Sequence, residues 1–111
     1  MAAAILYGAL KSGVLPKENA YVYDLNPAMM KKARGWGVNL AKDDEDVCKN
    51  SDIVLLAVKP QNAAEALAQC KNALDGKAMM SIVAGVTVER LRAMISGSLR
   101  ILRIMPNTPA M

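Results

Sequence analysis

The sequence predicts an α/β fold with an open, doubly wound and mostly parallel sheet. Short apolar runs alternate with helical patterns along the chain, and this order is typical of right-handed βαβ units. The clearest run, "IVLLAV" at residues 53–58, is apolar without alternation, so we expect a parallel strand that is covered on both faces. Glycine, proline and capping residues separate the runs at helix-length intervals.

The first predicted elements are a helix, a strand and a second helix. Apolar residues at helical spacing in "AAAILYGALK" predict the first helix, with Gly13 after its last turn. Residues 20–24 form a predicted short strand. Asn26 is a good N-cap, and Pro27 suits the first position of a helix over residues 27–34. An alternating fold normally begins with a strand, so a helix at the start is unexpected.

A short strand at residues 38–40 comes next, followed by a helix that Asp43 or Asp44 caps. Three more strands are then predicted, at residues 53–58, 77–83 and 100–105. Two helices join them, one from Pro60 and one that Thr87 caps. The buried stripe of the first of these helices is expected to consist of Ala63, Leu67, Cys70 and Leu74.

Composition limits the class of protein. The 111 residues are 53% hydrophobic and 22% charged, which is typical of one globular domain. The 14 basic residues are scattered and no aromatic platform lies among them, so we expect no nucleic-acid partner. Apolar runs are far shorter than the roughly 20 residues of a membrane span, and no basic signal-peptide region is present. We therefore expect a soluble cytoplasmic protein with no membrane partner.

The chain contains no histidine and two cysteines, Cys48 and Cys70, which do not form a CxxC pair. This inventory excludes a histidine-based triad and predicts no metal site. Both thiols are expected to be buried and reduced.

The residues after each strand are the candidate site, because open α/β sheets bind ligands beyond the carboxyl ends of their strands. These segments are "DLNP", "AVKP", "VAGV" and "MPNTP". Asp24 could accept a hydrogen bond from a cofactor ribose, or could be an ordinary strand-end residue beside the cap Asn26. Lys59 could face a phosphate or only solvent. Small residues at "VAGV" suit close approach of a cofactor or a simple turn.

Taken together, "YVYDLNP", "DIVLLAVKPQ", "SIVAGV" and "RIMPNTPA" resemble the N-terminal, Rossmann-type domain of pyrroline-5-carboxylate reductase, over the whole of residues 1–111. The resemblance implies an oxidoreductase of proline biosynthesis, which reduces 1-pyrroline-5-carboxylate to proline with NADPH or NADH. By the same resemblance the chain starts after the family's first strand and glycine-rich loop. It would also stop before the helical C-terminal domain through which the family forms homo-oligomers. The isolated chain is therefore expected to have little or no reductase activity.

The resemblance also assigns site residues. Asn26 would lie at the adenosine ribose or its 2′-phosphate, and Asp44 stands where family members often carry a cofactor-contacting asparagine. Asn107 and Thr108 would lie near the reacting ring, with no catalytic residue assigned more firmly. The complete set of expected cofactor-binding residues is Met1, Asp24, Asn26, Asp44, Ala57, Val58, Lys59, Pro60, Val83, Ala84 and Gly85.

Two other hypotheses remain open at this point. One is the NADP-binding portion of a related dehydrogenase, either a coenzyme F420-linked NADP oxidoreductase or a hydroxyacid dehydrogenase. The other is a non-catalytic α/β module that binds a partner through an exposed sheet edge.

Overall fold

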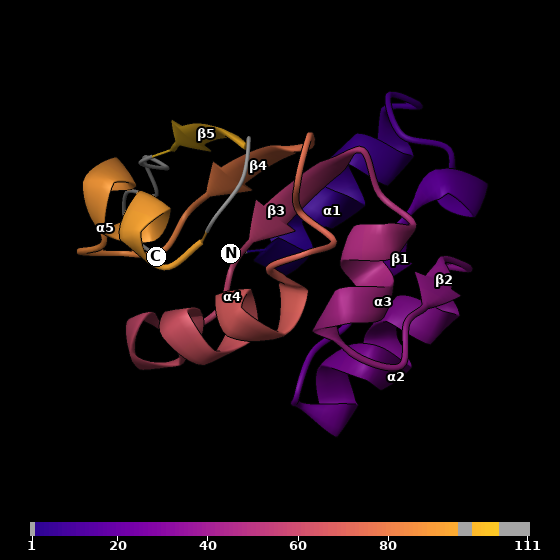
Figure 1. Cartoon of the computed structure of the whole chain (residues 1–111). Coiled ribbons are helices and arrows are strands. Elements are labelled where there is room, and N and C mark those ends of the chain that lie inside the picture. The colour runs from indigo at the N-terminus through magenta and orange to yellow at the C-terminus, as the bar shows by residue number, and fades with distance from the viewer. Residues whose placement is uncertain (1, 96–98, 105–111) are drawn as a thin grey trace. The chain divides into compact units, whose positions relative to one another are not determined.

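A computed structural model of the chain describes residues 2–95 and 99–104 (Figure 1). The chain forms two compact units, Met1–Ser51 and Asp52–Met111. Each unit contains one sheet, and every strand pairing in the described residues is parallel. The parallel α/β organisation expected from the sequence is therefore confirmed, with its strands grouped in two sheets.

The first unit contains a two-stranded sheet, in which Tyr21 pairs with Asn39 and Val22 with Leu40. Its small core is made by Ala20, Ala33 and Val38, against which Trp36 and several leucines pack. Its elements are α1 (Ala2–Lys11), η1 (Lys17–Asn19), β1 (Tyr21–Val22), α2 (Pro27–Gly35), β2 (Asn39–Leu40) and α3 (Asp44–Lys49).

Side-chain caps fix the starts of α2 and α3 where the sequence predicted them. Asn26 Oδ1 accepts a hydrogen bond from the Ala28 amide at 2.9 Å, and Pro27 occupies the first turn of α2. Asp43, not Asp44, caps α3, because its Oδ1 accepts from the Asp46 amide at 2.7 Å. Gly13 follows α1 with φ +81°, a conformation that glycine adopts without strain.

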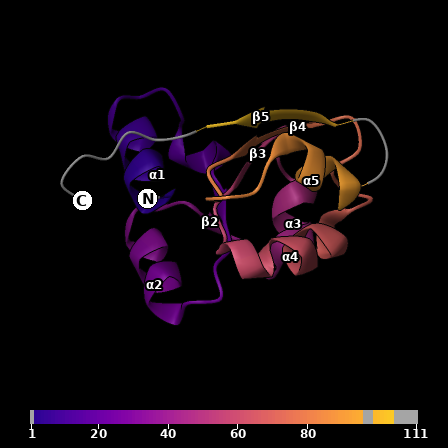
Figure 2. The same ribbon diagram turned by 90° about the vertical axis from the view of Figure 1, so that its left-hand side faces the viewer.

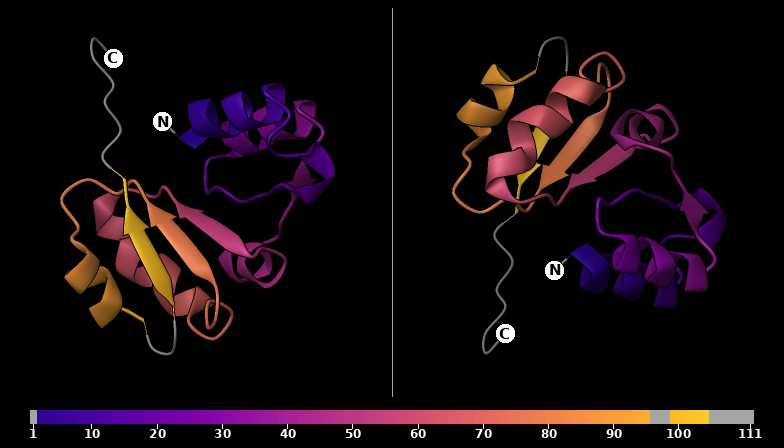
Figure 3. Two further views of the ribbon diagram at one scale, coloured as in Figure 1. Left: turned by 90° about the horizontal axis from the view of Figure 1, so that it is seen from above. Right: turned by 90° about the horizontal axis from the view of Figure 1, so that it is seen from below.

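The second unit is built on three parallel strands in the order β3-β4-β5. Helix α4 lies on one face of this sheet (Figures 2 and 3). Thr87 caps α5 by accepting from the Arg90 amide at 3.2 Å, as predicted. The elements are β3 (Ile53–Leu56), η2 (Pro60–Asn62), α4 (Ala63–Cys70), β4 (Ala78–Ser81), α5 (Val88–Ala93) and β5 (Arg100–Arg103).

The predicted buried stripe of the second unit is confirmed: Ala63, Leu67, Cys70 and Leu74 are all buried. Helix α4 itself ends at Cys70, and Leu74 lies in the following turn, where its amide donates to the Cys70 carbonyl at 3.0 Å. Cys48 and Cys70 are buried free cysteines, in agreement with the prediction.

One expectation for β3 is wrong. Val54 and Leu56 are buried, but Ile53 is 62% exposed, so the strand is not covered equally on both faces. The physical reason is that successive side chains of a strand point to opposite faces, and the face that carries Val54 and Leu56 is the buried one. The strands are also shorter than predicted, because β3 ends at Leu56 and not at Val58.

Within residues 2–95 and 99–104, no helix is long and apolar enough to cross a bilayer. No group of three or more cysteine or acidic side chains in these ranges could hold a metal ion.

We expect Leu67→Ala to lower the free energy of unfolding by about 2–5 kcal/mol, because it leaves a cavity under the sheet of the second unit. Leu67 is 2% exposed, whereas Leu102 of the same unit is 60% exposed. The matched variant Leu102→Ala should therefore cost less than about 1 kcal/mol. Urea unfolding followed by circular dichroism measures both, and equal losses would contradict the core described above.

Candidate functional site

The carboxyl ends of β3 and β4 bring the "AVKP" and "VAGV" segments to the same edge of one sheet. Leu56 pairs with Ser81, and the Ile82 amide donates to the Leu56 carbonyl at 3.1 Å, so the two strands end in register. Beyond this point Ala57 and Ala84 are exposed. Small side chains at both strand ends leave the backbone open to a flat ligand.

Gly85 extends this open surface. Its φ is +74°, and apart from its chain neighbours no heavy atom of the described residues lies within 4 Å of the position that a Cβ would occupy. A side chain there would be strained by the backbone conformation, which favours glycine.

Lys59 and Pro60 follow Ala57 and Val58 after the carboxyl end of β3. Lys59 is exposed, and its carbonyl accepts from the Asn62 amide at 2.9 Å as the chain enters η2. Its ammonium group is the cation closest in sequence to the end of β3. Val58 is half-buried beside it.

The side chain of Val83 is buried, which the sequence around it did not reveal. Its side chain is 3% exposed, so only its backbone could line a ligand. The Val83 amide donates to Ser81 Oγ at 3.2 Å, and Ser81 itself is fully buried. The prediction overlooked Ser81, although a lone hydroxyl within the apolar run "AMMSIVAGV" was a usable signal.

Asp24 and Asn26 form a compact polar turn after β1 in the first unit. Asp24 Oδ1 accepts from the Asn26 amide at 2.8 Å, and Asn26 Oδ1 caps α2. Both residues are exposed. Each side chain thus has a defined local role, and its exposed face remains available to a ligand.

Asp43 and Asp44 follow β2 at the same edge of the two-stranded sheet, because β1 and β2 run in parallel. Asp43 caps α3, and Asp44 is the half-buried first residue of that helix. The exposed basic residues Lys31, Lys32 and Arg34 lie in the second half of α2, which leads toward the amino end of β2.

Three predicted site residues, Met1, Asn107 and Thr108, lie outside the residues that the structure describes. The remaining ones fall into two groups, one in each unit. Strand β5 ends at Arg103, whose buried Nε has no hydrogen-bond partner among the described residues. The sequence reasoning overlooked this arginine.

The chain matches the family described as "NADP oxidoreductase coenzyme F420-dependent" over residues 1–85, and it belongs to that family. The curated relatives that the chain matches point to one particular enzyme. It is 40% identical over 117 residues to the pyrroline-5-carboxylate reductase of Pasteurella multocida, with 100% of the chain and 42% of the relative aligned.

Solved structures lead to the same group of enzymes. A pyrroline-5-carboxylate reductase from Coxiella burnetii matches with a TM-score of 0.89 and 27% identity, over 97% of this chain and 41% of that one. A Plasmodium falciparum pyrroline carboxylate reductase solved with NADP bound matches with a TM-score of 0.82 and 28% identity, over 96% and 38%. The fold is therefore Rossmann-like, and the chain spans about 40% of the length of these relatives.

We expect Asn26→Ala to lower the free energy of unfolding by about 0.5–2 kcal/mol, because α2 loses its cap. Asn26→Asp keeps an acceptor in the same place and should cost almost nothing. Asn72→Ala, at an exposed turn after α4, is the control for loss of an amide side chain. Urea unfolding compares the three, and an equal loss for Asn26→Asp would show that capping is not what Asn26 contributes.

Proposed function

We propose that this chain is the cofactor-binding part of an enzyme that reduces 1-pyrroline-5-carboxylate to proline with NADPH or NADH. The observation that carries the proposal is the match to pyrroline-5-carboxylate reductases along the whole chain, at 40% identity to the Pasteurella multocida relative. A Plasmodium falciparum relative with NADP bound supports the choice of cofactor. The remaining part of the enzyme would supply the substrate pocket and the homo-oligomer interface. A cytoplasmic location is consistent with the two free cysteines.

The residues present fit a nicotinamide cofactor. When bound, the cofactor supplies the hydride, so the protein needs to provide position and electrostatics but no nucleophile. The exposed small residues Ala57, Ala84 and Gly85 leave room for a flat ring against the strand ends. Lys59 would attract the anionic part of the cofactor or substrate. In the first unit, Asp24 and Asn26 would contact the adenosine ribose.

The reaction is balanced without a further redox group. One hydride adds to the imine carbon, one proton adds to the imine nitrogen, and the C=N double bond becomes the C–N single bond of proline. Asn107 and Thr108 would lie near this reacting ring. The absence of histidine from the sequence is compatible with such chemistry, since hydride transfer depends mainly on orientation.

A chimera tests the proposed function. The chain would replace the aligned segment of the Pasteurella multocida enzyme, and oxidation of NADPH would be followed with and without 1-pyrroline-5-carboxylate. We expect substrate-dependent turnover within about 100-fold of the parent enzyme, since a displacement of about 1 Å at the site can cost that much. A folded chimera that binds NADPH but does not reduce the imine would contradict the assignment of substrate.

We expect Asp24→Asn to raise the preference for NADPH over NADH by about two- to fivefold. The variant keeps an acceptor for the Asn26 amide but removes a negative charge that would repel a ribose 2′-phosphate. Nicotinamide fluorescence titrations give both dissociation constants.

Asp52→Asn is the matched control for this experiment, because it removes the same charge at the amino end of β3. An unchanged or lower preference in Asp24→Asn would show that Asp24 does not face the 2′ position.

A further inference from the structure

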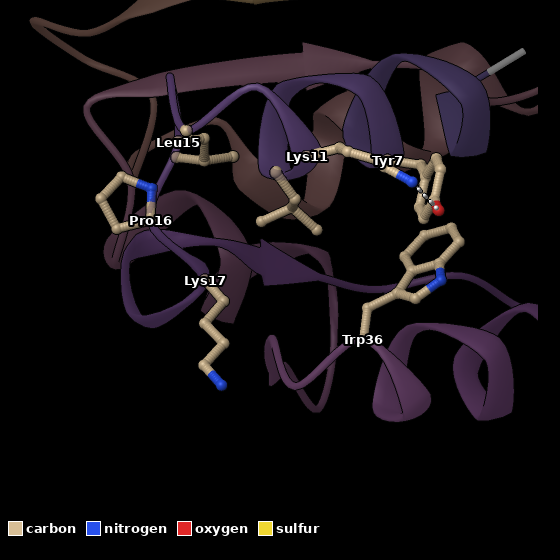
Figure 4. Close-up of a pocket in the computed structure, with 8 residues that line it drawn as sticks. Tyr7, Lys11, Leu15, Pro16, Lys17 and Trp36 are labelled. Carbon is tan, nitrogen blue, oxygen red and sulfur yellow. Dashed lines mark hydrogen bonds between the residues drawn. The ribbon is translucent and has the colours of Figure 1, made fainter.

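We propose that the first unit carries a second ligand site, for a small planar carboxylate such as an aromatic acid. The site is a hollow of about 340 Å³. Figure 4 shows Leu15 and Pro16 on one side of it and Tyr7 and Trp36 on the other. This volume is near the lower end of ligand pockets and suits a single-ring molecule. The complete lining is Tyr7, Leu10, Lys11, Gly13, Leu15, Pro16, Lys17 and Trp36.

An aromatic pair, the exposed Tyr7 and the half-buried Trp36, forms one wall of the hollow. The rings of Tyr7 and Trp36 lie 5.5 Å apart between centroids, with an interplanar angle of 42°. Tyr7 is 45% exposed. A second hollow shares Tyr7 and Trp36, so the pair is accessible from two sides. Such a wall would stack against a planar ring and gain the extra attraction of aromatic contacts.

Two lysines lie over this aromatic pair, and a third lines the first hollow. The Lys11 ammonium lies 5.6 Å from the Tyr7 centroid and donates to the Tyr7 hydroxyl at 3.4 Å. The Lys32 ammonium lies 5.9 Å from the Trp36 centroid. Lys17 lines the first hollow and is exposed.

No acidic side chain lines either hollow, and none of the three ammonium groups forms an ion pair within residues 2–95 and 99–104. The ligand that complements this surface is therefore an anion with a flat apolar body. A carboxylate on an aromatic ring provides both features in a molecule of the right size.

The hollow is separate from the proposed cofactor contacts of its own unit. Pro16 and Lys17 precede β1, and Trp36 precedes β2, so the lining lies toward the amino ends of these strands. Asp24 and Asn26 follow the carboxyl end of β1. A ligand here would not occupy the ribose position proposed above.

Titration of the 111-residue chain with benzoate tests the proposal. Trp36 is the only tryptophan of the sequence, so its indole N–H gives a single reporter peak in a ¹H–¹⁵N spectrum. We expect this peak to shift in a saturable manner with a dissociation constant of about 1–10 mM at low salt. Benzamide, the neutral analogue, should bind several-fold more weakly.

Charge variants make the test specific. The double variant Lys11→Gln, Lys17→Gln should weaken benzoate binding by about three- to tenfold. Lys71→Gln removes one charge from an exposed position after α4 and should leave binding unchanged. The proposal is overturned if the Trp36 peak has not shifted when benzoate reaches about 10 mM. It is also overturned if benzamide binds as tightly as benzoate, or if Lys71→Gln weakens binding as much as the double variant. Unaltered circular dichroism of each variant shows that the fold is intact.

Discussion

Parallel strand pairing is the constraint on which the rest of this structure depends. Parallel neighbours need a crossover between them, so each strand must be followed by a connection that returns to the opposite edge. In the second unit this requirement places α4 between β3 and β4 and α5 between β4 and β5. It also brings the ends of β3 and β4 together, so that Ala57 and Ala84 share one edge without being close in sequence. The parallel pairing of β3 and β4 therefore accounts for the exposed backbone around Ala57 and Ala84.

Local signals in the sequence were sufficient to locate the helices. The caps Asn26 and Thr87 act through hydrogen bonds to amides two or three residues away, so their effect can be read from a short segment. The buried stripe through Leu67 and Cys70 follows from helical spacing in the same way. Leu74 kept its buried position although the helix ends before it, because a hydrogen-bonded turn continues in its place.

Strand pairing and burial were harder to predict, because they depend on distant residues. Ile53 and Val54 are both apolar, so the hydrophobic pattern could not show that one is exposed and the other buried. The sequence also did not show that β1-β2 and β3-β4-β5 form separate sheets.

In the candidate site, the positions of the segments could be predicted from the sequence, but the orientation of individual side chains could not. The four strand-end segments were identified from their positions after apolar runs, and the structure places two of them on one edge of the second unit. The inward orientation of Val83 and its hydrogen bond to Ser81 could not be predicted, because they depend on how β4 packs. Asp24 and Asn26 illustrate a further point: a residue that completes a turn or a helix can still present its exposed face to a ligand.

We propose that a nicotinamide cofactor binds at the carboxyl ends of these parallel strands. Titration of the ¹⁵N-labelled chain with NADPH, followed by amide chemical shifts, tests it most directly. We expect saturable shifts at five amides, those of Asp24, Asn26, Ala57, Lys59 and Gly85. Shifts confined to the amino ends of the strands, such as Asp52 and Lys77, or no saturable shift at all, would contradict it.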